Sequence, residues 1–252
     1  MSNLMTILPK KSGRSKGTVT VRHQGGRQKR YLRHIDFARS KRDVWGVVKT
    51  IEYDPNRNAD IALVVYKDGD KRYILAPEKL KKGNKVIASD VAPLEVGNAL
   101  PLGKIPAGTS VHNIEIRPQK GGQMVKSAGA SAVVQGKEEN FVLVKLPSTE
   151  IRRFDPKCFA TIGEVSNAHL KSLKGSTAGR NRRLGIRPSV RGVAMHPGAH
   201  PHGGGEGRSG VGLKYPKTPY GKKAVGKTRA KRKYSDKLIV ARRKPGKHAK
   251  NK

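Results

Sequence analysis

Residues 195–208 read MHPGAHPHGGGEGR and bring three imidazoles close together in the chain, at His196, His200 and His202. Spacings of four and two could gather three ligands for a transition metal, but such sites usually also include Cys or carboxylate ligands. No Cys accompanies these histidines, and Glu206 is the only nearby acid. We therefore predict no metal site here. The chemistry that remains is stacking and hydrogen bonding of the imidazoles to nucleic acid bases and phosphates.

Two glycine patterns resemble nucleotide-binding loops. Residues 221–228, GKKAVGKT, match G-x-x-x-x-G-K-[ST] in full, and residues 205–210 match the weaker G-x-G-x-x-G. A phosphate loop of this kind needs a buried strand before it and a helix after it, and no apolar periodicity flanks either segment. We predict that the chain is not an enzyme and has no resident cofactor, apart from Mg²⁺ that would accompany any nucleic acid it binds.

No other set of catalytic side chains stands out. His112 falls in a strand pattern and is expected on a barrel surface or at the edge of a core. Cys158, within RFDPKCFATIG, is expected to be a small core residue without a partner base. Since a single cysteine cannot form an internal disulfide, an intracellular, reducing environment is expected.

The distribution of charge along the chain indicates which segments fold and which extend from the fold. The net charge is +36, and it is unevenly distributed. Residues 1–34 have 9 basic and no acidic side chains, and residues 171–252 have 24 basic and 2 acidic ones, whereas residues 35–95 and 96–170 are nearly neutral. Charge of this size predicts a dense polyanionic partner, above all nucleic acid. A membrane partner is disfavoured, because the basic stretches are broken by Gly and Pro and the longest apolar run is about six residues, where a spanning helix needs about 20.

The neutral centre shows short strand patterns. GVVKTIEY (46–53), DIALVVY (60–66) and DKRYILA (70–76) follow one another, with Asp68 and Gly69 as a two-residue hairpin turn before the third. TSVHNIEI (109–116), FVLVKL (141–146), TEIRRF (149–154) and CFATIG (158–163) form a second group. Helical periodicity is scarce, with the best candidate a short turn near residues 77–82. Two consecutive small β-barrels are predicted, with a boundary near residues 95–102.

The C-terminal segment 171–252 contains 14 of the 29 glycines and only three aromatic residues. It cannot bury enough apolar surface to offset the entropy of ordering, so we expect it to be disordered in water without a partner. Glycine lets backbone N–H groups approach phosphates and bases closely, and arginine pairs with phosphate oxygens. RNA contact, with RNA imposing the shape of residues 191–208, is favoured over a flexible linker, because linkers lack arginine at this density.

The chain resembles the universal large-subunit ribosomal protein family "L two", in its bacterial or organellar form. The resemblance extends over nearly the whole chain and rests on eight blocks in family order: VRHQGGRQKRYLRHIDF, IEYDPNRNADIAL, GDKRYILAP, GNALPLGKIPAGTSVHNIEI, KGGQMVKSAGASA, CFATIGEVSN, LGIRPSVRGVAM and HPHGGGEGR. It implies a mainly β chain with a basic N-terminal extension at 1–34, an OB-fold-like barrel at 35–95, an SH3-like barrel at 96–170 and an RNA-threading extension at 171–252.

The resemblance also implies a function, which is that of a structural constituent of the large ribosomal subunit. Such a protein binds rRNA near the peptidyl transferase centre and supports its assembly, subunit association and tRNA binding. Neighbouring ribosomal proteins, and the small subunit across an intersubunit bridge, are the expected partners, in a bacterial cytoplasm or an organelle. The expected RNA contacts are the arms' basic residues and the histidine and glycine block: Arg22, Arg27, Lys29, Arg30, Arg33, Arg180, Arg182, Arg183, Arg187, Arg191, His200, His202, Gly203, Gly204, Gly205, Arg208, Lys227 and Arg229.

Two departures from the family pattern are visible. The position before His200 is usually acidic, and here it is Ala199, so an Asp–His pair cannot act in acid–base chemistry at this site. The N-terminal extension is also expected to be about thirty residues shorter than the bacterial pattern, judged from that resemblance. Two other classes stay open. One is a nucleic-acid packaging protein, which the two compact barrels disfavour, and the other is a nucleotide-dependent enzyme built on residues 221–228.

Overall fold

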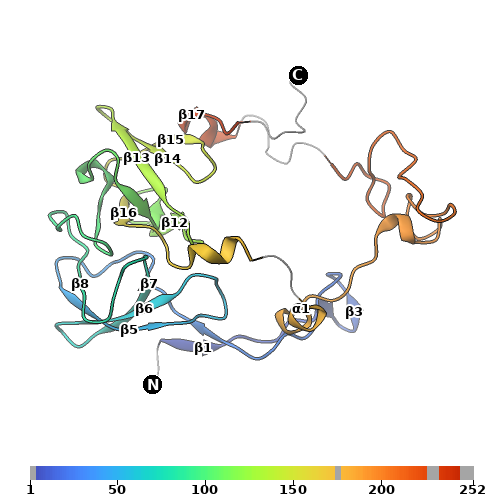
Figure 1. Ribbon diagram of the computed structural model, residues 1–252, viewed down its shortest axis with the longest axis horizontal. Helices are drawn as coiled ribbons and strands as arrows, with labels where there is room; N and C mark the ends of the chain where they lie inside the picture. Colours follow the sequence, from blue (N-terminus) through green and yellow to red (C-terminus); the bar gives the residue numbers. More distant parts are fainter. Residues whose placement is uncertain (1–3, 174–176, 226–232, 245–252) are drawn as a thin grey trace. The chain divides into compact units, whose positions relative to one another are not determined.

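The computed structural model describes residues 4–173, 177–225 and 233–244, which divide into two compact units (Figure 1). The first unit contains the described residues 4–8, 30–173 and 235–244. The second contains residues 9–29, 177–225 and 233–234. The two arms that the charge pattern distinguishes therefore supply one unit together, apart from residues 4–8, 30–34, 171–173 and 235–244.

The first unit begins with a four-stranded antiparallel sheet in the order β7-β6-β5-β8. The strands are β5 (Gly46–Glu52), β6 (Ile61–Tyr66), β7 (Lys71–Leu75) and β8 (Lys85–Val86). Val48, Val64, Ile74 and Val86 point into one apolar cluster, because alternate residues of a strand face the same side. The three strands predicted for this region are confirmed.

The turn between β6 and β7 differs from the two-residue hairpin that was expected. Three residues, Lys67 to Gly69, connect the strands: the Gly69 N–H donates to the Tyr66 carbonyl and the Tyr66 N–H donates to the Asp70 carbonyl, both at 2.9 Å. Gly69 has φ +83°, a left-handed conformation that follows a type I turn in three-residue hairpins. The dipeptide Asp68-Gly69 thus predicted the position of the hairpin correctly, but the length of its loop was predicted wrongly.

A second antiparallel sheet has seven strands in the order β17-β15-β14-β13-β10-β16-β9. Its strands are β9 (Ala99–Pro101), β10 (Ser110–His112), β13 (Ala132–Lys137), β14 (Val142–Lys145), β15 (Ile151–Phe154), β16 (Phe159–Ile162) and β17 (Ile239–Ala241). The four strand patterns predicted here are confirmed, although 109–116 is split at Asn113, where φ is +50°. The continuation, β11 (Ile114–Glu115), pairs with β12 (Gly122–Met124) instead. Strands β9, β13 and β17 were not predicted.

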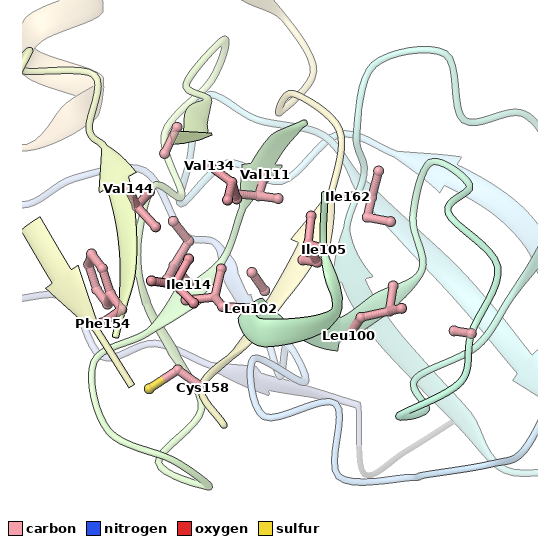
Figure 2. Close-up of a cluster of buried hydrophobic side chains, with 14 of the residues drawn as sticks. Leu100, Leu102, Ile105, Val111, Ile114, Val134, Val144, Phe154, Cys158 and Ile162 are labelled. Atoms are coloured by element: carbon pink, nitrogen blue, oxygen red, sulfur yellow. The ribbon is translucent and has the colours of Figure 1, made fainter. Parts of the chain in front are cut away.

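Sixteen buried residues form the core beneath this sheet. Figure 2 shows ten of them labelled, from Val144 and Phe154 at one side to Leu100 and Ile162 at the other. Cys158 is fully buried among them, as predicted. The expected surface or core-edge position of His112 is wrong: the side chain is 1% exposed, and the Nδ1–H donates to the Gly163 carbonyl at 2.8 Å.

The two sheets meet around a buried arginine in the same unit. Arg39 is 3% exposed, and its guanidinium donates to the carbonyl oxygens of Gly97 at 3.0 Å and Ile87 at 3.5 Å. Both carbonyls belong to the segments that connect the sheets, where Ala88 pairs with Ala99. The predicted mainly β architecture of an OB-fold-like barrel followed by an SH3-like barrel is confirmed.

Short elements complete the described chain. They are β1 (Met5–Ile7) paired with β4 (Tyr31–Arg33), β2 (Arg14–Ser15) paired with β3 (Thr18–Val19), the single α-helix α1 (Ala178–Leu184), and the 3₁₀ turns η1 (Leu102–Lys104), η2 (Ala168–Lys171), η3 (Gly192–Ala194) and η4 (Tyr234–Leu238). Residues 77–82, the best helix candidate from the sequence, contain turn residues and an isolated bridge from Pro77 to Val165 but no helix. No helix among the residues described has the length and apolar character needed to cross a membrane.

Candidate nucleic-acid interface

The second unit has an unusual composition for a folded body. All three apolar clusters of the described chain lie in the first unit, and in the second only Gly25 and His200 are buried. Its residues 9–29 and 177–225 contain 17 Lys and Arg residues and one acid, Glu206. Backbone hydrogen bonds and turns, rather than a hydrophobic core, therefore give this unit its described conformation.

The two arms pair along a short antiparallel stretch within this unit. The Gly25 N–H donates to the Gly185 carbonyl at 2.8 Å, and the Gln28 N–H to the Arg183 carbonyl at 2.9 Å. In the opposite direction, the Arg187 N–H donates to the His23 carbonyl at 3.0 Å. Residues 23–28 and 183–188 are thus held in register, which places basic residues from both arms on one body.

Helix α1 (Ala178–Leu184) begins and ends with ordinary capping residues. The Thr177 hydroxyl accepts from the Arg180 N–H at 3.4 Å, and Gly185 closes the helix with φ +92°. No residue of the helix is buried, so Arg180, Arg182 and Arg183 all lie on an exposed surface. Arg182 also covers Gly25, where an added Cβ would come within 2.6 Å of its guanidinium. The sequence signals of this helix are Thr before it and Gly after it, and they did not enter the prediction.

The predicted N-terminal contacts divide between the two units. In the second unit, Arg22 donates to the Tyr220 hydroxyl at 3.3 Å and Arg27 to the Pro9 carbonyl at 3.3 Å, while Lys29 is exposed. These side chains remain on the surface beside the paired stretch.

Arg30 and Arg33 lie in the first unit instead, half-buried against the first barrel. Arg30 donates to the Pro55 carbonyl at 3.1 Å, and Arg33 lies 3.9 Å from the carboxylate of Asp54. Burial alone would raise the pKa of Asp54, but hydrogen bonds, chiefly from Arg57 at 2.7 Å, outweigh it and hold that pKa below its usual value. Part of the charge of Arg33 is therefore already compensated within the protein.

The histidine and glycine block folds on itself through a series of backbone hydrogen bonds. The His196 carbonyl accepts from the N–H groups of Ala199 at 2.9 Å and His200 at 3.3 Å. The Gly203 N–H then donates to the His200 carbonyl at 2.9 Å, and the Gly204 N–H to the Met195 carbonyl at 3.2 Å. Residues 195–204 thus have turns of their own in this structure, and the expectation that RNA imposes the shape of residues 191–208 stays a prediction.

The imidazoles take part in this internal bonding. His200 is 8% exposed, its Nδ1 accepts from the His202 N–H at 3.0 Å, and its ring lies against Gly192. The Nε2 of His202 accepts from the Lys217 N–H at 2.8 Å. Because a backbone N–H can only donate, each of these ring nitrogens must carry a free lone pair. The histidines act here as acceptors that fix the loop, and no metal-binding group of His, Cys, Asp or Glu occurs among the described residues.

The glycines of the block adopt conformations that suit their residue type. Gly204 and Gly205 have φ +90° and +91°, which other residues rarely adopt. A Cβ on Gly203 would come within 2.6 Å of the Met195 carbonyl oxygen. Backbone conformation and close contacts within the protein itself therefore require glycine at these three positions.

Of the remaining predicted contacts, Arg187, Arg191 and Arg208 are exposed on the second unit, whereas Lys227 and Arg229 lie outside the described residues. The described part of the GKKAVGKT pattern belongs to a turn in which the Ala224 N–H donates to the Pro216 carbonyl at 2.9 Å. The same turn presents Lys222 and Lys223, which sequence reasoning did not single out, although Thr218 and Gly221 are its turn residues.

Two protein-family models match the chain. The model described as Ribosomal Proteins L2, RNA binding N-terminal domain, matches residues 1–88. The model described as Ribosomal Proteins L2, C-terminal domain, matches residues 95–221. The first matched segment includes the first barrel and the N-terminal arm, and the second includes the other barrel and the loop of His200. The chain belongs to the ribosomal protein L2 family, whose members are structural, RNA-binding proteins of the large ribosomal subunit.

Proposed function

We propose that this protein binds large-subunit rRNA near the peptidyl transferase centre, where it supports assembly of that centre, association with the small subunit and tRNA binding. Its ribosome would be of the bacterial or organellar type. Neighbouring ribosomal proteins would contact the barrels, and Mg²⁺ bound to the rRNA would be the only metal nearby. The protein itself would carry no catalytic group.

The observation that supports this proposal is the second unit, with 18 basic residues, one acid and no apolar cluster among its described residues. Such a surface repels itself, so a dense array of phosphates stabilises it. Its backbone turns already place Arg180, Arg182 and Arg183 on one exposed helix. Arginine is suited to this task, because its planar fork donates two hydrogen bonds to one phosphate.

The same geometry supports a structural rather than a catalytic role for the loop of His200. A general acid or base must reach its substrate within hydrogen-bonding distance, and the His200 ring is nearly buried with its Nδ1 already bonded. Ala199 provides no carboxylate to orient or charge the ring. The loop would instead present its outer backbone and arginines to RNA, which carries the chemistry.

The proposed location can be tested by tethering a radical source to the loop. Cys158 is fully buried, and burial raises the pKa of its thiol to about 12, so it should not react with a maleimide reagent. Ala199→Cys then offers one exposed thiol for an iron chelate, and the labelled full chain is reconstituted into large subunits that lack their own copy of this protein. Hydroxyl-radical cleavage of rRNA around the peptidyl transferase centre is expected.

A matched probe on the barrel, Lys145→Cys, should cleave a different set of nucleotides, because Lys145 lies exposed on β14 in the other unit. Cleavage from Ala199→Cys confined to rRNA regions remote from the peptidyl transferase centre would refute the proposed location. Failure of the labelled chain to enter subunits at all would refute the assembly role.

A further inference from the structure

The outer face of the first sheet has apolar residues where solvent-facing residues are expected. Val47 on β5 pairs with Val65 on β6 and with Lys85 on β8, so these three side chains lie side by side across the sheet. Val47 is 43% exposed, whereas its neighbour Val48 is buried in the core. Trp45, two residues before Val47, continues this row on the same face and is half-buried.

A cavity of about 640 Å³ lies over this row. Its lining residues are Trp45, Val47, Val65, Tyr66, Lys67, Lys85 and Glu95. The volume falls within the range of pockets that hold small organic groups. Trp45 is fixed on one side, because it packs against the core cluster of the second barrel and its carbonyl accepts from the Lys67 N–H at 3.2 Å. The indole is thus a rigid wall of the cavity.

The chemistry of the lining favours an aromatic anion as occupant. The lining includes an indole and two valines, which provide apolar surface, and two ammonium groups against one carboxylate, that of Glu95. Bases stack on aromatic side chains at a gain of about 1–3 kcal/mol each, and this stacking tolerates any base. The net charge of +36 disfavours a basic protein partner and attracts a polyanion. Six of the seven lining residues lie within the segment matched by the RNA-binding domain model.

We propose that this cavity, the Trp45 pocket, holds one unpaired nucleotide of RNA, with its base stacked on the indole of Trp45 and its flanking phosphates at Lys67 and Lys85. The pocket adds a stacking site on the first barrel to the arginine-rich surface of the second unit. The proposal rests on the RNA-binding role of the chain but not on where in the ribosome it binds.

Trp45 is the only tryptophan of the chain, so its fluorescence reports directly on this pocket. The full chain is titrated with a heptamer of oligoadenylate, and the indole emission is followed alongside the anisotropy of an end-labelled copy of the same oligonucleotide. Quenching that saturates with the heptamer is expected. A heptamer with abasic residues should still bind through its phosphates, as anisotropy reports, but should not quench.

Lysine variants separate this pocket from the rest of the basic surface, and they leave the core packing of Trp45 intact. Lys67→Ala with Lys85→Ala should raise the heptamer concentration at half-quenching by about fivefold or more, the equivalent of about 1 kcal/mol. The control, Lys137→Ala with Lys145→Ala, removes two exposed lysines of the other sheet and should leave half-quenching unchanged.

Three results would overturn the proposal. Equal quenching by the abasic heptamer would exclude stacking. Unchanged emission when anisotropy shows saturation would exclude an RNA nucleotide in the Trp45 pocket and indicate that another partner binds there. Quenching by free adenosine monophosphate but not by the heptamer would indicate a site for a mononucleotide. Absence of any anisotropy change would instead contradict RNA binding by the whole chain, so the two failures are distinguishable.

Discussion

His112 gives the protein a pH-dependent stability whose size follows from its environment. The ring is completely buried on β10, and this burial lowers its pKa from about 6.5 to about 4, with the nearby charge of Arg39 acting in the same direction. The hydrogen bond from its Nδ1 to the Gly163 carbonyl opposes the shift only in part. The folded protein therefore keeps His112 neutral at pH values where the unfolded chain protonates it.

The sign follows from proton binding. Between pH 6.5 and 4 the unfolded state binds a proton at His112 that the folded state does not, so the free energy of unfolding falls as the pH falls. The part of the free energy of unfolding that depends on neutral His112 is fully present above pH 6.5. It decreases by about 2 kcal/mol at pH 5 and by roughly 3 kcal/mol below pH 4, since one pKa unit corresponds to about 1.36 kcal/mol.

The assay is urea unfolding of the full chain at pH 7.5, 6 and 5, followed by the fluorescence of Trp45, which packs against the core cluster beneath the seven-stranded sheet. The His112→Gln variant retains a donor for the Gly163 carbonyl but cannot titrate, so its stability should fall by about 2 kcal/mol less than that of the wild type between pH 7.5 and 5. If His112→Gln does not fold, His112→Asn takes its place. A stability difference between wild type and variant that stays constant with pH would refute the reasoning.

Removing residues 171–252 should flatten the slope of log affinity for rRNA against log salt by ~0.7–0.9 for each phosphate that the segment neutralises, in filter binding from low to high salt; an unchanged slope would move the binding surface to the barrels. In assembled subunits, His200→Gln should leave the rate of peptidyl transfer within a few-fold and its pH profile unchanged, and a loss of roughly 100-fold would restore a catalytic role. Gly204→Val, which forces a β-branched residue to φ +90°, should stall subunit assembly in sedimentation gradients, and normal assembly would contradict this. Gly129→Ala, at φ +55° and against the backbone of η2, should lower the free energy of unfolding by about 1–3 kcal/mol, whereas Gly136→Ala, with no atom within 4 Å of its Cβ, should be nearly neutral.

Local sequence patterns and the distribution of charge predicted several strands and the class of partner. Short apolar and β-branched runs bounded by turn residues identified strands at 46–53, 60–66 and 141–146, because such residues favour the extended conformation and turns separate adjacent strands. The segregation of 33 basic residues into the arms indicated a polyanionic partner before any fold was known. Both are properties of neighbouring residues, so they need no knowledge of long-range contacts. Contact of the individual arginines and glycines with RNA stays a prediction.

Long-range pairing decided the rest. Residues 23–28 pair with residues 183–188 through backbone groups, which nearly every residue type has. The side-chain pattern therefore could not predict the second unit. Strands β13 and β17 are defined by the neighbours they pair with, and α1 is too short and too polar for apolar periodicity. The burial of His112, the acceptor role of His200 and the Trp45 pocket likewise arise only when segments distant in the chain pack together. The sequence alone determined which chemistry was present, and the tertiary structure decided which groups remained free to use it, because burial and hydrogen bonding depend on neighbours far along the chain.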